Sequence, residues 1–348
     1  MASKYSRVFL TALGYELGPQ VVTSAELEER LAPVYRQLSI HPGQLEAWTG
    51  IAERRWWHSD TRLSAGAAAA RKAMAGTSVQ AADLGVVIYA GVCRENFEPA
   101  TACAVADALG VKGGVSVYDL SNACLGVLNG MLEIANRIEL GQIRAGLVVS
   151  CETARQINEI MIARLLNGVE MDQFAEALAT FTGGSGAVAM LLTDGSFTGP
   201  AGHRLLGAVS QVAPEHHQLC RWGLSPAEGL QQEQFMATDS VSVLKYGVQL
   251  GRQTWQVFLK EMGWTADQVD HVICHQVGSG HQDAILNSLQ VPKEKDYTTY
   301  RFLGNMGTAA LPVTAAIAGE RGVLKAGQRV AFLGIGSGLT CLMMGLEW

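Results

Sequence analysis

Charged residues and prolines are both scarce in this sequence. Only 17% of its 348 residues are charged, only 9 are proline, and no block of Lys or Arg occurs that could follow a nucleic-acid backbone. The net charge is −6, and the hydrophobic fraction of 48% is far above that of a disordered chain. The composition therefore argues against nucleic acid as a partner. It predicts a large buried core in one large domain or two ordinary ones.

Paired cysteines and long apolar runs are also missing. The seven cysteines form no CxxC pair, so we expect no disulfide framework and a reducing, cytoplasmic location. The first residues, MASKYSRVFLTALG, contain no long apolar core with a cleavage site, so we expect no signal peptide. The most apolar stretch, 331–347, is interrupted by Gly334, Gly336 and Gly338. It predicts two strands around a turn instead of a membrane span.

Short runs rich in Val, Ile and Leu alternate with helical patterns along the chain, which indicates an α/β architecture. A strand covered on both faces needs nearly continuous apolar sequence. We expect such strands at Leu84–Val92, Ala145–Ser150, Gly186–Thr193, His271–Cys274 and Arg329–Leu333. Apolar residues at helical spacing predict helices at 64–74, 125–140, 241–262 and 311–319. The segment Gly195–Gln234 is less periodic, and we expect it to connect two halves of the chain.

Cys124 lies where an apolar segment gives way to a helical pattern. In the sequence YDLSNACLG, its thiol would stand at the N-terminus of the helix predicted from Leu125. Aligned peptide dipoles favour an anion there, so the position predicts a lowered thiol pKa and a nucleophilic cysteine. Most cysteines are only small buried apolar residues. We expect that role for Cys103, Cys151, Cys274 and Cys341.

Three further segments carry polar or glycine-rich patterns beside predicted strands and helices. His275 directly follows the strand His271–Cys274, and Asn305 stands in LGNMGTAALP between glycines that let a ligand approach the backbone closely. The segment LGIGSGL, which contains Ser337, lacks the GxGxxG spacing of a dinucleotide loop. We expect it to offer backbone N–H groups to an oxyanion. Each segment is a weak signal on its own.

In this order, the segments SNACLG, CHQ, GNMGTAALP and GIGSGL resemble the ketoacyl synthase III family of the thiolase superfamily over essentially the whole chain. The resemblance implies a thiolase fold of five layers, αβαβα, built from two similar halves. Residues 1–200 would carry Cys124, and residues 201–348 would carry His275 and Asn305. It also implies a homodimer that acts in fatty acid or other lipid metabolism.

The resemblance further implies a ping-pong reaction. Cys124 would take an acyl group from acyl-CoA, while backbone N–H groups of Cys124 and Ser337 hold the oxyanion. His275 and Asn305 would then stabilise the enolate of a second thioester, which attacks the acyl group. A malonyl thioester forms this carbanion by losing CO₂ and needs only His275 and Asn305. Decarboxylative condensation to a 3-oxoacyl product is therefore the reaction we expect first.

Glu98 points to an alternative reaction. The segment FEPATA is similar to the head-to-head condensing enzymes of bacterial olefin biosynthesis, a branch of the same family. There a glutamate from the partner subunit would remove the α-proton of a second fatty acyl-CoA, giving a 2-alkyl-3-oxo acid without loss of CO₂. A surface carboxylate paired with Arg94 is the simpler interpretation of Glu98. A non-catalytic acyl-binding protein is a third hypothesis, disfavoured because the Cys, His and Asn are all present.

The remaining polar candidates concern ligands and partners. Arg54 and Arg55 are candidates for binding a CoA phosphate. His216, His217 and Cys220 lack a fourth ligand at the usual spacing, so we expect no metal. We expect no cofactor either, since acyl-CoA is a substrate. An acyl carrier protein is an optional partner. Its docking is weakened by Trp48, where ordinary synthases have Arg, and by the lack of Lys or Arg in 278–283.

Overall fold

A ten-stranded mixed sheet forms the framework of the computed structural model, which describes residues 1–58, 62–197, 202–225 and 233–348. Its strands are β1 (Ala2–Lys4), β2 (Phe9–Leu17), β5 (Leu84–Ala90), β6 (Ser116–Leu120), β7 (Ala145–Glu152), β8 (Gly186–Thr193), β9 (His203–Val212), β12 (His271–Cys274), β13 (Arg329–Gly336) and β14 (Thr340–Glu347). The order is β12-β13-β14-β9-β2-β8-β7-β5-β6, with β1 paired to β9. Two short antiparallel pairs lie outside it, β3 (Gln20–Thr23) with β4 (Glu53–Trp56) and β10 (Cys220–Leu224) with β11 (Gln234–Thr238).

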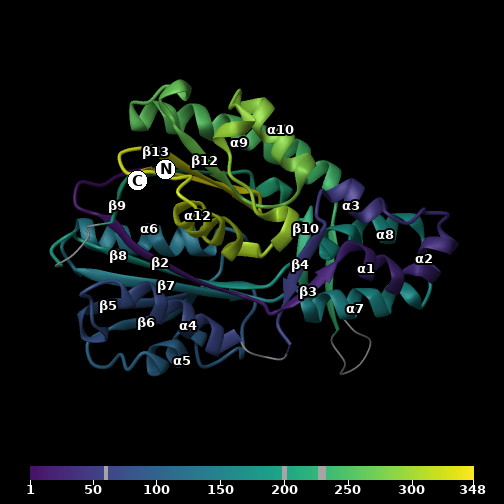
Figure 1. Cartoon of the computed structure of the whole chain (residues 1–348), viewed down its shortest axis with the longest axis horizontal. Coiled ribbons are helices and arrows are strands. Elements are labelled where there is room, and N and C mark those ends of the chain that lie inside the picture. The colour runs from purple at the N-terminus through teal and green to yellow at the C-terminus, as the bar shows by residue number, and fades with distance from the viewer. Residues whose placement is uncertain (59–61, 198–201, 226–232) are drawn as a thin grey trace.

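The sheet divides into two halves, because β2 and β9 pair only at Phe9–Leu10 with His203–Arg204. Helices α6 (Gly126–Glu139) and α12 (Ala310–Glu320) lie between the halves (Figure 1). Helices α4 (Arg62–Ala75) and α5 (Thr101–Ala108) cover the outer face of one half, and α9 (Ser240–Met262) and α10 (Ser279–Leu289) cover that of the other. This arrangement confirms the five-layered thiolase fold.

A smaller group of helices lies at one end of the molecule, beside β3 and β4 (Figure 1). Its members are α1 (Ser24–Arg30), α2 (Ala32–Gln37), α3 (Gln44–Thr49), α7 (Arg155–Leu166) and α8 (Met171–Ala177). They share a separate apolar core that contains Leu27, Leu31, Trp56 and Phe174. Helix α11 (Tyr300–Leu303) lies outside these groups, and short 3₁₀-helices of the described residues lie at 81–83, 178–182, 214–216, 266–268, 293–295 and 307–309.

The predicted strands and helices are all present, with bounds that differ by a few residues. The strands β7 and β8 are buried along their whole length, which explains their continuous apolar sequence. The residues after Gly334 turn back from β13 into β14, as the glycines predicted. Among the described residues, no helix combines the length and apolarity that a membrane crossing needs.

The interpretation of Gly195–Gln234 as a plain connection is wrong. It contains β9, a ten-residue strand that pairs with β14 through the centre of the sheet. The strand escaped prediction because polar residues such as Arg204 and Gln211 interrupt its apolar pattern. The expected boundary between residues 200 and 201 lies outside the described residues, so the division at that point stays a prediction.

Candidate active site

Cys124 lies in the short segment between the edge strand β6 and the central helix α6. The preceding residue, Ala123, has a left-handed backbone with φ of 45°, a conformation that is uncommon for a residue with a side chain. The turn between β13 and β14 packs directly on the nucleophile. A Cβ added to Gly336 would lie 3.4 Å from the Cys124 nitrogen and 3.6 Å from its Cβ. Glycine therefore lets the turn predicted to carry an oxyanion site approach Cys124.

His275 directly follows β12, and its backbone N–H donates to the carbonyl of Leu333 in β13 at 3.0 Å. Its side-chain Nδ1 is buried and has no hydrogen-bond partner among the described residues. Burial, together with the nearby His281, lowers the pKa of His275 to about 4. The imidazole is therefore neutral near pH 7. It can hydrogen-bond to a carbonyl oxygen without carrying a charge.

Asn305 stands in a turn that is held from both sides by backbone hydrogen bonds. Its N–H donates to the carbonyl of Thr182 at 2.8 Å, and its carbonyl accepts the N–H of Gly184 at 2.9 Å. The side-chain Oδ1 accepts the N–H of Gly307 at 3.0 Å. Because this bond occupies the amide oxygen, the Nδ2 group is the side-chain donor left for a ligand.

Two cavities meet at Cys124. The first, of about 270 Å³, is lined by Cys124, His275 and Asn305, so the structure brings the three predicted residues together. It extends between α9, α10 and β14 along an apolar wall that includes Val248, Ile285, Leu339, Cys341 and Met343. The second, of about 530 Å³, is also lined by Cys124, Asn305 and Ser337. A group on Cys124 can therefore face either space.

The expected lowering of the Cys124 pKa is wrong. Burial raises the pKa of Cys124 to about 12, and the nearby Cys220 and Glu152 act in the same direction. Part of the side chain faces the cavities, yet desolvation outweighs the effect of the helix N-terminus. The N–H of Val127, in the first turn of α6, is moreover occupied by the hydroxyl of Thr308 at 2.7 Å. Cys124 is therefore a thiol at neutral pH.

Two other predictions need correction. Arg54 has no exposed surface, and its guanidinium donates to Ser24 Oγ and the Phe181 carbonyl at 3.0 Å each. It ties β3 and β4 to the site scaffold and cannot reach a CoA phosphate, whereas Arg55 is only half-buried. Cys103 is exposed in the chain and is not a buried apolar residue, unlike Cys151, Cys274 and Cys341.

Glu98 lies in the loop between β5 and α5 and is exposed, as is Phe97 at 97%. It lines neither cavity of its own chain. Exposure in a single chain is what a residue that enters a partner subunit would show, and it is equally what a surface carboxylate shows. The role of Glu98 therefore stays a prediction at this point.

Glu152, at the end of β7, is a polar residue of the site that sequence reasoning missed. It is 4% exposed, lines the second cavity, and accepts the N–H groups of Val92 and Cys93 at 3.0 and 3.1 Å. An acid that directly continues the apolar run Ala145–Ser150 is the signal that could have revealed it. No group of three His, Cys, Asp or Glu side chains within the described ranges could hold a metal ion.

Comparisons with known proteins agree along the whole chain. Residues 259–348 match the family described as 3-oxoacyl-[acyl-carrier-protein (ACP)] synthase III C terminal. The chain is 56% identical to the acyl-CoA:acyl-CoA alkyltransferase of Shewanella oneidensis, over 99% of this chain and 100% of that protein. It is 34% identical to the enzyme of the same name from Xanthomonas campestris, over 99% of both.

Solved structures of Xanthomonas campestris OleA have the same fold. The cerulenin-bound form superposes with a TM-score of 0.92 at 34% identity, covering 99% of this chain and 98% of that one. A form in which a cysteine is replaced by serine, with bound lauric acid and lauroyl-CoA, has the same TM-score. Other forms of that protein carry substitutions at one glutamate or at one histidine.

Proposed function

Since the chain belongs to the acyl-CoA:acyl-CoA alkyltransferase family of condensing enzymes related to ketoacyl synthase III, we propose that it joins two fatty acyl-CoAs head to head. The product would be a 2-alkyl-3-oxo acid. The observation that carries this proposal is that two cavities both open on Cys124. The relatives support this reaction better than the decarboxylative condensation with a malonyl thioester that we expected first.

The first half-reaction uses Cys124. Its sulfur attacks the acyl-CoA carbonyl, the thiol proton is lost as CoA leaves as a thiol, and an acyl thioester forms on Cys124. The raised thiol pKa and lowered imidazole pKa disfavour a standing thiolate–imidazolium pair. Proton transfer therefore accompanies the attack. The backbone N–H groups of Cys124 and Ser337 would hold the oxyanion, because the turn containing Ser337 packs on the nucleophile.

The second half-reaction forms the carbon–carbon bond. The carbonyl of a second acyl-CoA would accept hydrogen bonds from neutral His275 and from Asn305 Nδ2, which lowers the energy of its enolate. A base removes the α-proton, and the carbanion attacks the acyl group on Cys124. This attack breaks the carbon–sulfur bond and returns the thiol. Water then releases the second CoA from the condensed product.

We propose Glu98 of a second subunit as this base. In the Xanthomonas protein, the substituted glutamate and cysteine are separated by the same number of residues as Glu98 and Cys124. The exposure of Glu98 and Phe97 suits a loop that inserts into a partner. The outermost strand of that half, β6, is partly exposed along its length and can pair with a second copy.

The proposal is tested by supplying one labelled fatty acyl-CoA with no malonyl thioester. We expect a 2-alkyl-3-oxo acid, or the ketone formed from it by loss of CO₂, together with release of two CoA. Glu98→Gln should retain acylation of Cys124 and lose this product, while Glu294→Gln, at another exposed glutamate, should behave like wild type. Product that forms only when malonyl-CoA is added would refute the head-to-head reaction.

The remaining assignments follow from this reaction. Acyl-CoA serves as donor and acceptor, so no resident cofactor is needed and an acyl carrier protein is dispensable. We propose that Arg55, a half-buried residue of β4, binds the CoA phosphates, since Arg54 is buried. The enzyme would act as a cytoplasmic homodimer in lipid metabolism. Arg55→Ala should raise the KM for acyl-CoA more than it lowers kcat.

A further inference from the structure

Glu152 is a buried carboxylate for which the reaction described above has no use. Oε1 accepts the Val92 N–H and Oε2 accepts the Cys93 N–H. The backbone N–H of Thr308, from the other half of the chain, also favours the charged form of this carboxylate. Burial raises the pKa of Glu152, and these backbone donors oppose that shift by stabilising the charged form. Two segments that are distant in sequence, Val92–Cys93 and the turn at Thr308, therefore meet at one side chain.

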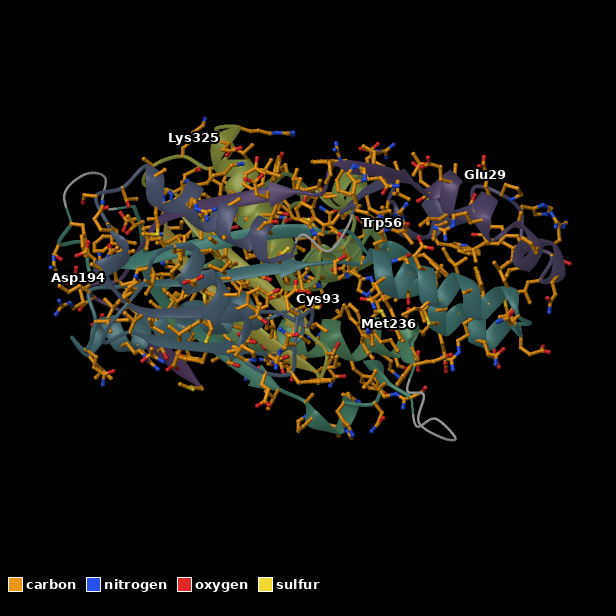
Figure 2. The ribbon with its side chains drawn as sticks, turned by 90° about the horizontal axis from the view of Figure 1, so that it is seen from below. Glu29, Trp56, Cys93, Asp194, Met236 and Lys325 are labelled. Atoms are coloured by element: carbon orange, nitrogen blue, oxygen red, sulfur yellow. The ribbon has the colours of Figure 1, made fainter. Side chains whose placement is uncertain are left out.

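The first two donors belong to the loop that carries Glu98. Val92 and Cys93 form the stem by which this loop leaves β5. At its other stem, the N–H groups of Thr101 and Ala102 donate to the Asp119 carboxylate at 2.9 Å each. The Glu98 segment is thus held between two carboxylates. Cys93 is at the end of this loop that Glu152 holds. Figure 2 shows it near the middle of the long axis of the molecule, with Asp194 toward one end and Glu29 toward the other.

Thr308 belongs to the turn that carries Asn305, and this turn packs on Glu152. A Cβ added to Gly307 would lie 3.4 Å from the Glu152 carboxyl group, and one added to Gly91 would lie 3.3 Å from Oε1. Both backbones therefore pack closely on the carboxylate. The turn also reaches the nucleophile, because the Thr308 hydroxyl accepts the Val127 N–H at the start of α6.

We propose that Glu152 is a positioning residue for condensation, which holds the Asn305 turn and the stem of the Glu98 loop in fixed relation at one wall of the second cavity. The proposal rests on the proposed function for the role of Glu98. Each Glu152 would set Asn305 in its own site and Glu98 for the site of the partner. Small errors in the placement of reacting groups cost up to about a hundredfold in rate.

The discriminating variant is Glu152→Gln, which keeps the size of the side chain but turns one acceptor into a donor that faces a backbone N–H. We expect condensation to fall roughly 10- to 100-fold. Acylation of Cys124, measured by the mass of the peptide that contains it, should change less than about threefold, because Glu152 does not hold the oxyanion turn. This split between half-reactions is a readout that general loss of structure would not produce.

The matched control is Glu139→Gln. Glu139 accepts the N–H groups of Ser6 and Arg7 at 3.0 and 3.2 Å, but it lies at the far end of α6, about 20 Å along the helix from Cys124. It should leave both half-reactions unchanged. If Glu152→Gln does not fold, Gly91→Ala tests the same contact, because its methyl group would lie 3.3 Å from Oε1 and crowd the contact between Glu152 and the loop stem. It should give a smaller loss of condensation with acylation retained.

Assays with fatty acyl-CoA or malonyl-CoA as the second thioester distinguish failure of this inference from failure of the proposed function. If the wild type condenses only malonyl-CoA, the head-to-head reaction is refuted. Glu152→Gln must still impair that condensation more than acylation, because it displaces Asn305. Equal loss of both half-reactions, or no loss of either, would overturn the positioning role whichever extender the wild type uses.

Discussion

The two halves of the molecule end their sheets in different ways. At the C-terminal half the outer side of β12 is closed within the chain, because Val272 forms a bridge with Asp296 and the Cys274 N–H donates to Asp296 Oδ1 at 3.4 Å. At the N-terminal half, β6 is the last strand and every residue in it keeps some exposed surface. An unpaired edge is a template for another strand. The difference indicates which half is free to meet a second copy.

The two central helices, α6 and α12, also differ in how much of their surface is exposed. Residues 310–318 of α12 are all buried, whereas α6 has a partly exposed face that includes Glu133 and Arg137. Yet each helix begins beside one functional group, Cys124 before α6 and Asn305 before α12. Under the proposed function, one layout serves two tasks: acyl transfer at the N-terminal half and enolate stabilisation at the C-terminal half.

The largest effect should come from the N-terminal half. Cys124→Ala removes the only group proposed to carry the acyl chain, so both half-reactions should fall below detection. Mass spectrometry of the intact chain after incubation with acyl-CoA measures this directly. An acyl adduct that persists in the variant, or that appears on Cys220 in the wild type, would contradict the assignment.

Substitutions in the C-terminal half should separate the two reactions. His275→Ala and Asn305→Ala each remove one donor to the enolate oxygen, so condensation should fall roughly a hundredfold or more. Acylation of Cys124 should fall much less, and single-turnover assays of the two steps measure both. Equal losses would show that the division of tasks between the halves is wrong.

The rate of alkylation of Cys124 tests whether burial raises the pKa of its thiol. With the Cys124 pKa raised to about 12, only a small fraction is thiolate near pH 7, and that fraction rises about tenfold per pH unit up to the pKa. Peptide-resolved alkylation by iodoacetamide should show this slope from pH 7 to 9, with exposed Cys103 as the comparison within each sample. A plateau at Cys124 below pH 8 would mean that the helix N-terminus overcomes desolvation.

The open edge of β6 should pair in solution. Light scattering at micromolar concentration should give about twice the mass of one chain, as expected for a large isologous interface. Backbone amides of Ser116–Leu120 should exchange slowly in the dimer and faster after dilution, whereas those of His271–Cys274 should not change. A stable monomer at micromolar concentration would remove both the dimer and the proposed role of Glu98.

The smallest effect concerns the closed edge at β12. Desolvation raises the pKa of Asp296 to about 7 from its usual 3.8. A carboxyl group raised in this way contributes stability below about pH 4 that is lost as the pH rises through about 7. Asp296→Asn should therefore gain a few degrees in Tm relative to wild type between pH 4.5 and 8. Exposed Asp267→Asn serves as the control, and a constant difference would refute the buried titration.

Local sequence predicted much of the fold because buried strands need continuous apolar residues whatever their neighbours are. The strands β8 and β12 have the predicted bounds for this reason. The strand β9 was missed because its apolar pattern is interrupted, and its place at the centre of the sheet depends on β14, over 100 residues later. Cys124, His275 and Asn305 were found because each sits in a short motif beside a predicted strand or helix.

The sequence by itself determined the composition of the core, the α/β alternation and the residues proposed to carry the chemistry, since these depend on residue type and near neighbours. Only the tertiary structure decided the environment of those residues. It placed Arg54 in the interior, raised the pKa of Cys124, and brought the Val92–Cys93 backbone and the turn at Gly307 together at Glu152. Burial and hydrogen bonding are made by groups that are distant along the chain, so no local pattern carries them.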